Sequence, residues 1–139
     1  MRTEISKSLP QEAIDIRQKV FVEEQGFQNE FDEIDKRATH FVVFDRTNTP
    51  LATCRLFMEE ESGAYILGRV AVVKEGRGKG IGSFIVRTVE EYVKAIDGKE
   101  LRLHAQCRIT PFYTKLGFSE YGQIEDDEGC PHIWMRKNV

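Results

Sequence analysis

The stretch Val70–Ser83, V-A-V-V-K-E-G-R-G-K-G-I-G-S, joins an apolar, β-branched run to a turn with glycine at every second position. A long amphipathic pattern follows directly, so the stretch predicts a strand, a glycine-rich turn and the start of a helix. The first N–H groups of a helix lack carbonyl partners, and the helix dipole places positive potential at the same end. This stretch therefore predicts a binding site for an anion such as a phosphate group.

The spacing of the glycines separates the known kinds of phosphate-binding loop. The dinucleotide pattern G-x-G-x-x-G requires a third glycine at position 81 or 83, where the chain has Ile81 and Ser83. The Walker pattern requires lysine followed by serine or threonine, but Lys79 is followed by Gly80, and Val73 occupies the position of its first glycine. Both patterns fail, which leaves Arg-x-x-Gly-x-Gly over residues 77–82.

This remaining pattern resembles the acetyl-CoA loop of the GCN5-related N-acetyltransferase (GNAT) superfamily. A second segment, Phe112–Phe118 (F-Y-T-K-L-G-F), resembles the F-Y-x-K-L-G-F segment of the same family. Outside this core, Val20–Gly26, Asp32–Asp35 and Glu125–Met135 resemble the small ElaA/YjcF-like branch. The resemblance therefore covers nearly the whole chain, although the branch match says little about the substrate.

Hydrophobic periodicity predicts an α+β (mixed α/β) fold. Strands are expected at 2–6, 39–45, 51–59, 64–73 and 100–106, with two closing strands near 119–122 and 132–136 around an acidic loop. Helices are expected at about 10–22, 81–96 and 110–116, the second ending at a left-handed glycine, Gly98. The resemblance implies a GNAT-like twisted sheet of about six or seven strands, mostly antiparallel, with one parallel βαβ joint at the acetyl-CoA loop and about four flanking helices. We expect residues 1–139 to form a single N-acetyltransferase domain.

Composition narrows the function classes. The 139 residues are 40% hydrophobic and 31% charged, with a formal net charge of −3, so a nucleic-acid partner is not expected. No apolar run approaches the roughly 20 residues of a membrane span. The three cysteines are far apart and form no C-x-x-C pair, which is typical of reduced thiols. We therefore expect a cytoplasmic protein without a membrane partner, and a homodimer is the common state of a small enzyme.

The resemblance implies acetyl-CoA as co-substrate. The amides of residues 78–83 would take the pyrophosphate, and the main chain of residues 70–72 would pair with the pantetheine where the strand and its parallel partner part beyond Val72. One N–H there is a candidate oxyanion donor. Many family members have asparagine where this chain has Gln106. The implied cofactor-binding residues are Val70, Ala71, Val72, Arg77, Gly78, Lys79, Gly80, Ile81, Gly82, Ser83, Gln106, Phe112, Tyr113 and Lys115.

The resemblance also implies that Tyr113 is the general acid for the departing thiolate; a core tyrosine is the alternative. Glu24 and His132 are the first candidates for the general base or for acceptor contacts, because both lie in segments that resemble the branch. The sequence leaves further candidates open: Glu33, Asp35, Glu125, Asp126, Asp127, His40 and His104. The three histidines lack the spacing of metal ligands, so no metal is expected.

The acceptor is less well defined than the donor. Acidic segments at 30–35 and 125–128 suggest a cationic acceptor, or they are simply solvated. Arg55 and Arg69 could instead bind a phosphorylated acceptor, or could form ordinary cross-strand pairs with glutamates. We expect transfer of the acetyl group of acetyl-CoA to a primary amine of a small molecule, by direct attack in a ternary complex. The alternatives are an acyl-CoA-binding or sensory module with little turnover, and an acetyltransferase of protein lysines or N-termini.

Overall fold

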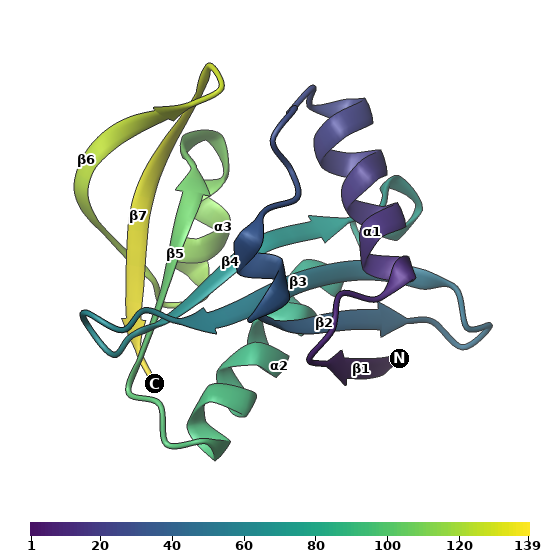
Figure 1. Ribbon diagram of the computed structural model, residues 1–139, viewed down its shortest axis with the longest axis horizontal. Coiled ribbons are helices and arrows are strands. Elements are labelled where there is room, and N and C mark those ends of the chain that lie inside the picture. Colours follow the sequence, from purple (N-terminus) through teal and green to yellow (C-terminus); the bar gives the residue numbers. More distant parts are fainter. The chain divides into compact units, whose positions relative to one another are not determined.

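The computed structural model describes residues 1–139 (Figure 1). Its strands are β1 (Arg2–Ser6), β2 (Thr39–Phe44), β3 (Pro50–Met58), β4 (Tyr65–Val72), β5 (Glu100–Gln106), β6 (Ser119–Asp127) and β7 (Cys130–Asn138). Its helices are α1 (Gln11–Arg17), α2 (Ile81–Ala95) and α3 (Thr110–Lys115), with a π-helix η1 (Gln18–Glu24) and the short 3₁₀ turns η2 (Glu33–Lys36), η3 (Lys74–Gly76) and η4 (Cys107–Ile109).

The seven strands are hydrogen-bonded in the order β1-β2-β3-β4-β5-β7-β6. Strands β4 and β5 run parallel, with Tyr65–Leu67 opposite Leu101–Leu103, and α2 is the connection between them. The β1–β2, β2–β3, β5–β7 and β6–β7 pairs are antiparallel. The predicted mixed α+β fold and its parallel joint are confirmed.

The chain divides into two compact units, and β4 and α2 contribute to both. The first unit contains Met1–Phe57 and Gly68–Val89. In it, β2 is buried along its whole length, as its apolar sequence T-H-F-V-V-F requires, and α1 packs against this strand. Ala13 and Ile16 form the buried face of α1. This unit carries the glycine-rich turn.

The second unit contains Met58–Leu67 and Glu90–Val139. Its strands β5, β7 and β6 alternate between two faces, as the period of two in a strand requires. One face is apolar and buried, and consists of Leu101, Leu103, Ala105, Ile133 and Met135. The opposite face carries rings and polar groups, and the short turn η4 connects β5 to α3. This unit carries the Phe112–Phe118 segment.

Several predicted boundaries differ from the structure. Strand β6 runs to Asp127 and β7 starts at Cys130, so most of the expected acidic loop is strand. The first predicted helix changes after Arg17 into a π-helix, so only three helices are α-helical. At the end of α2, Asp97 takes the left-handed conformation (φ 62°) that was expected of Gly98. Glycine is needed at 98 for packing, because a Cβ there would lie 2.4 Å from Val93 Cγ1.

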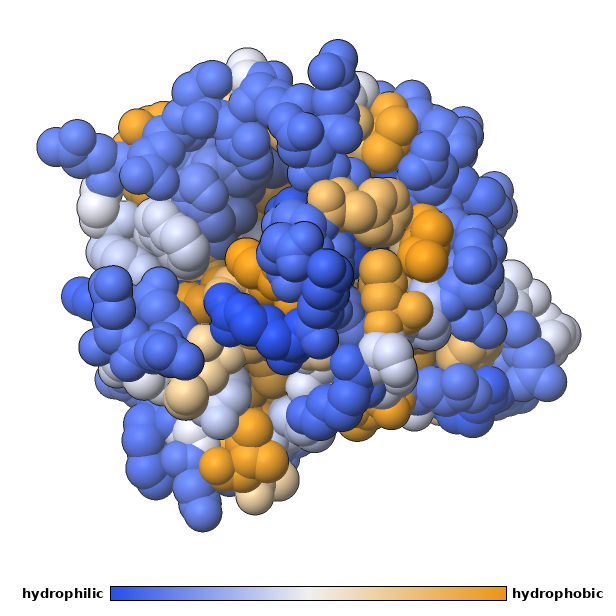
Figure 2. Space-filling model, in the orientation of Figure 1, coloured by the Kyte–Doolittle hydropathy of each residue, from blue (hydrophilic) through white to orange (hydrophobic).

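The surface agrees with the modest hydrophobicity of the sequence. Figure 2 shows a mostly hydrophilic face on which apolar residues lie in several separate areas. No helix is both long enough and apolar enough to cross a membrane. The single-domain organisation and the cytoplasmic location remain predictions.

Candidate active site

The glycine-rich turn lies between β4 and α2 in the first unit. Gly76 is buried, and a Cβ there would lie 3.3 Å from both Ile81 Cδ1 and Val72 Cγ1. Gly78 and Gly80 have φ of 77° and 75°, and a Cβ on either would meet no atom within 4 Å. Both glycines are exposed in the turn that precedes the fifteen-residue helix α2, whose first N–H groups lack intrahelical partners. A glycine-rich turn at a helix N-terminus is an arrangement that can bind a diphosphate.

Arg77 of this turn is held by two partners. Its Nη2 donates to Glu24 Oε1 at 2.6 Å, and its Nε donates to the Val72 carbonyl at 3.1 Å. The side chains of Arg77 and Glu24 remain partly exposed, at 45% and 36% respectively. Glu24 is the last residue of the π-helix η1, a rare geometry that often marks functional segments. Glu24, predicted as a base or an acceptor contact, thus lies at the cofactor turn in an ion pair with Arg77.

Strand β4 contains a residue with a left-handed backbone before it reaches the turn. Its parallel pairing with β5 ends at Leu67, and not beyond Val72 as the resemblance implied. Two residues later, Arg69 has a φ of 51°, which is unusual for a residue with a side chain. The main chain of Val70–Val72 therefore follows a left-handed residue and lies beyond the stretch of β4 that pairs with β5.

Arg69 belongs to a network of ion pairs that the sequence did not reveal. Arg17, 1% exposed, donates from Nε to Glu30 Oε2 at 2.8 Å and from Nη1 to Asp35 Oδ1 at 2.8 Å. Arg55, 4% exposed, donates from Nη1 to Asp35 Oδ1 at 2.9 Å and to Asp32 Oδ1 at 2.6 Å. Three arginines and three carboxylates thus neutralise one another.

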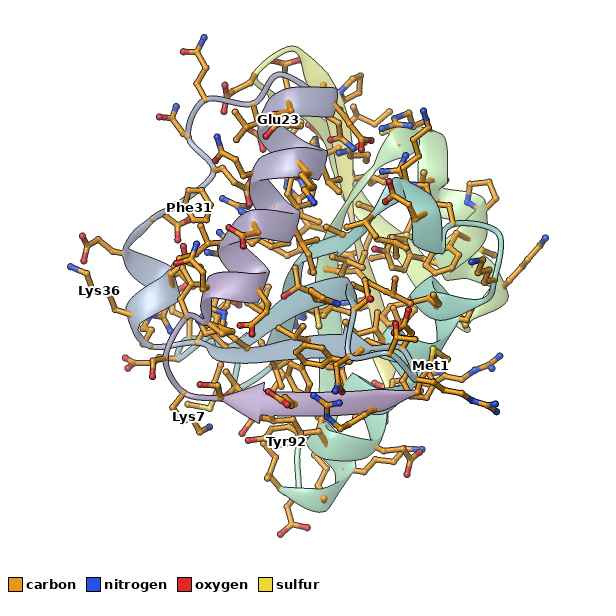
Figure 3. All side chains as sticks on the ribbon, turned by 90° about the vertical axis from the view of Figure 1, so that its right-hand side faces the viewer. Met1, Lys7, Glu23, Phe31, Lys36 and Tyr92 are labelled. Atoms are coloured by element: carbon orange, nitrogen blue, oxygen red, sulfur yellow. The ribbon has the colours of Figure 1, made fainter.

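Phe31 and Lys36 belong to the same segment as the acidic members of the network, and Figure 3 shows their positions. Phe31 lies beside α1, and Lys36 projects outward from η2. The Phe31 ring lies 4.7 Å from the guanidinium carbon of Arg17, a distance typical of cation–π contact. The aromatic ring therefore covers part of the buried network on its outer side.

The network changes the interpretation of the acidic segment at 30–35. Glu30 and Asp35 are buried rather than solvated. Burial opposes ionisation of Asp35, but hydrogen bonds from Arg17, the Asp32 amide and Arg55 hold its pKa well below the usual range, so it is unsuited to act as a base. Burial raises the pKa of Glu30 despite its arginine partners. Arg55 and Arg69 form ion pairs with the carboxylates of this segment, and not with glutamates on neighbouring strands.

Other candidate bases in the first unit are also engaged. His40 is 1% exposed and its Nε2 donates to the Asp35 carbonyl at 2.9 Å. Glu33 is exposed and pairs with Lys36 at 2.9 Å. His40 serves the packing of η2 against β2, and Glu33 lies on the surface.

Tyr113 lies in α3 of the second unit and is 5% exposed. Its ring makes edge-to-face contacts with Phe112 and Phe118, with centroids 5.0 and 5.9 Å away. Lys137 Nζ donates to the Leu116 carbonyl at 2.7 Å and to both carboxylate oxygens of buried Glu90. The helix that carries Tyr113 is thus fixed at its C-terminal end, while Lys115 is exposed in its last turn.

On the polar face of β5, β7 and β6, the ring of His104 lies next to the rings of His132 and Trp134. The His104 ring lies 4.9 Å from His132 and 4.7 Å from Trp134, and its Nε2 lies 3.1 Å from Glu125 Oε1. Burial, followed by the neighbouring His132, lowers the pKa of His104. His132 Nδ1 lies 2.8 Å from the Cys130 carbonyl, which can only accept, so Nδ1 carries the hydrogen and neutral His132 presents Nε2 as its basic nitrogen.

The predicted site residues fall into two groups, one in each unit. Gln106, at the end of β5, is buried and pairs in register with His132. The local sequence around Arg17, Glu30 and Lys137 does not distinguish their buried ion pairs from surface charges, so only the structure assigns these partners. The first unit holds Glu24, Val70, Ala71, Val72, Arg77, Gly78, Lys79, Gly80, Ile81, Gly82 and Ser83, and the second holds Gln106, Phe112, Tyr113, Lys115 and His132.

Comparison with known proteins settles the family. The model of the acetyltransferase (GNAT) domain matches residues 5–139. The chain belongs to the GNAT acetyltransferase family. The N-acetyltransferase YjcF of Bacillus subtilis (strain 168) is 32% identical over 143 residues, covering 99% of this chain and all of the relative. The ElaA protein of Escherichia coli (strain K12) is 26% identical and covers 99% of this chain and 92% of its own.

Solved structures of this GNAT chain's relatives show the same fold. A Lactobacillus plantarum protein, described provisionally as an N-acetyltransferase, is 27% identical with a TM-score of 0.89, covering 99% of this chain and 97% of its own. The crystal structure of Escherichia coli ElaA has a TM-score of 0.83 at 23% identity, covering 99% of both chains. The GNAT family supports acyl transfer from acyl-CoA, so this chain is an acyl-CoA-dependent acyltransferase.

Proposed function

We propose that this GNAT protein transfers the acetyl group of acetyl-CoA to a primary amine of a small molecule, by direct attack in a ternary complex. One observation carries the donor half of the proposal. Gly78 and Gly80 are left-handed and exposed, and they lie in the turn that leads directly into the N-terminus of α2. Residues 78–83 would hold the pyrophosphate, with Lys79 and Arg77 adding positive charge. Acetyl-CoA supplies the activated acyl group when it is bound.

The main chain of Val70–Val72 has the second role. It follows the left-handed residue Arg69 and lies beyond the stretch of β4 that pairs with β5. Its N–H groups would bind the pantetheine and polarise the thioester carbonyl, and one such donor typically contributes a few kcal/mol of barrier lowering. The Val72 carbonyl already accepts from Arg77, so Arg77 also fixes the end of this strand.

Tyr113 is the proposed donor of the proton that the thiolate of CoA needs when it leaves. As a buried phenol in α3, it would protonate the departing thiolate, and Gln106 would bind the cofactor with its amide. Glu24 and His132 are the candidates for contact with the acceptor or for its deprotonation. The ion pair of Glu24 with Arg77 favours a role in holding the cofactor turn, whereas the fixed tautomer of His132 suits a proton acceptor.

Calorimetry with acetyl-CoA, followed by a thiol-release screen over polyamines, amino sugars, aminoglycosides and peptides, tests the proposal. We expect saturable binding and turnover above hydrolysis with at least one small amine. Tyr113→Phe should lower kcat by about a hundredfold, the scale of general acid catalysis, while acetyl-CoA affinity is largely retained. Absence of acetyl-CoA binding would refute the proposal.

The screen also separates the alternatives. Binding without turnover on any amine would favour an acyl-CoA-binding or sensory module. Turnover on peptides alone would favour a protein acetyltransferase. Unchanged turnover in Tyr113→Phe would remove this residue from its role.

A further inference from the structure

We propose that Glu30 is a positioning residue for the acyl-CoA strand and that it acts through Arg69. The inference rests on the proposed function, because it assumes that the main chain of Val70–Val72 binds the cofactor. The proposed role involves the buried ion-pair network, which takes no part in the proposed cofactor binding or proton transfer.

Arg69 is the residue at which β4 turns left-handed. This conformation is unfavourable for a residue with a Cβ, so other contacts must hold it in place. Arg69 Nε donates to the Glu30 carbonyl at 3.0 Å and lies 3.1 Å from Glu30 Oε2. Its Nη2 lies 3.4 Å from Asp32 Oδ2. Both partners belong to the segment before β2, about forty residues earlier in the chain.

Glu30 is itself held firmly. It is 4% exposed, and its Oε2 accepts from Arg17 Nε at 2.8 Å, while its carbonyl accepts from Arg17 Nη2 at 2.9 Å. Arg17 in turn pairs with Asp35, which also binds Arg55 of β3. The partner of Arg69 thus belongs to a buried ion-pair network that includes Arg17 of α1 and Arg55 of β3.

Because a rigid anchor holds the kinked residue, the next three residues have a fixed course. Those residues, Val70–Val72, are the proposed partners of the pantetheine and the thioester carbonyl. A small displacement of such donors is costly, since they must lie within hydrogen-bond distance of the group they stabilise. Loss of the anchor should therefore weaken acetyl-CoA binding in protein that is still folded.

Three variants test this inference by calorimetry with acetyl-CoA. Arg69→Gly removes the anchored side chain, while glycine adopts the left-handed conformation without strain, so we expect the Kd to rise about tenfold from lost anchoring alone. Glu30→Gln keeps the carbonyl acceptor and removes the carboxylate charge, so a smaller rise of about threefold is expected. Glu33→Gln, an exposed acid in the same segment, is the matched control and should bind like wild type.

A double-mutant cycle identifies the route. If Glu30 acts through Arg69, Glu30→Gln should have little further effect on the Kd in the Arg69→Gly background. Any effect of Glu30→Gln that acts through Arg17 would appear in the melting temperature. A purely structural role of Glu30 would also change the melting temperature, so the Kd is the quantity that identifies the route. Arg69→Lys retains the positive charge, so its affinity for acetyl-CoA should lie between that of Arg69→Gly and that of the wild type.

Wild-type affinity in Arg69→Gly, or full additivity of the two changes in the Kd, would overturn the inference. If Glu30→Gln does not fold, Glu30→Asp, which keeps the charge on a shorter side chain, replaces it in the double-mutant cycle with Arg69→Gly. These failures differ from a failure of the proposed function, in which the wild-type protein itself would not bind acetyl-CoA.

Discussion

Replacement of Gly80 by alanine tests whether the turn before α2 is a cofactor cradle or only a chain reversal. Gly80 has a φ of 75°, and a Cβ there meets no atom within 4 Å. The substitution therefore costs only the left-handed conformation, roughly 1–2 kcal/mol, with no steric clash. For a chain of this size the melting temperature should fall by roughly 3–8 °C.

Gly63 is a matched control within the same protein. It lies in the turn between β3 and β4, has a φ of 74°, and a Cβ there also meets no atom within 4 Å. Gly63→Ala should lower the melting temperature by a similar amount. The two variants thus pay the same conformational cost, and any difference between them in acetyl-CoA binding arises from the space in front of the turn.

Only the change at position 80 should weaken the binding of acetyl-CoA. A Cβ in the cradle keeps a phosphate from at least one main-chain N–H, and a hydrogen bond to a charged group contributes about 1.5–3 kcal/mol. That loss corresponds to roughly a 10- to 150-fold increase in Kd. Calorimetric titration of Gly80→Ala and Gly63→Ala measures the difference. Equal affinities in the two variants would refute the assignment of this turn to the cofactor.

Three further predictions concern the charges. Arg17→Met removes one arginine partner from each of the buried carboxylates Glu30 and Asp35 and should lower the free energy of unfolding by about 3 kcal/mol, whereas Arg2→Met, at an exposed pair, should change it by less than about 0.5 kcal/mol in denaturant titrations. Because the pKa of Asp35 is lower in the folded state, its contribution is present above about pH 4 and is lost as the pH falls further; an acid unfolding curve unaffected by Asp35→Asn would contradict this. Because the pKa of His104 is lowered on folding, the unfolded chain takes up the proton first, so stability should fall as the pH drops through about 6.5, and His104→Asn should flatten melting temperatures between pH 7.5 and 5.5.

Local sequence determined much of this protein. The glycine spacing over residues 77–82, together with the F-Y-T-K-L-G-F segment, identified the family, because a close main-chain approach to phosphate imposes a strict local pattern. Strong periodicity also placed β5 and α2 almost to the residue, since one face of each must meet a core. The identity of the acceptor has no such local pattern and stays a prediction.

Only the tertiary structure determined which charged side chains are buried in ion pairs. Glu30, Asp35 and Arg17 look like ordinary surface residues in the sequence, yet they are buried together and neutralise one another. Glu24 likewise meets Arg77 across 53 residues of chain. A charge is tolerated in the interior only where a partner from a distant segment reaches it, and that partner depends on the path of the whole chain. The left-handed kink at Arg69 belongs to the same class, because contacts far away in the sequence hold it in place.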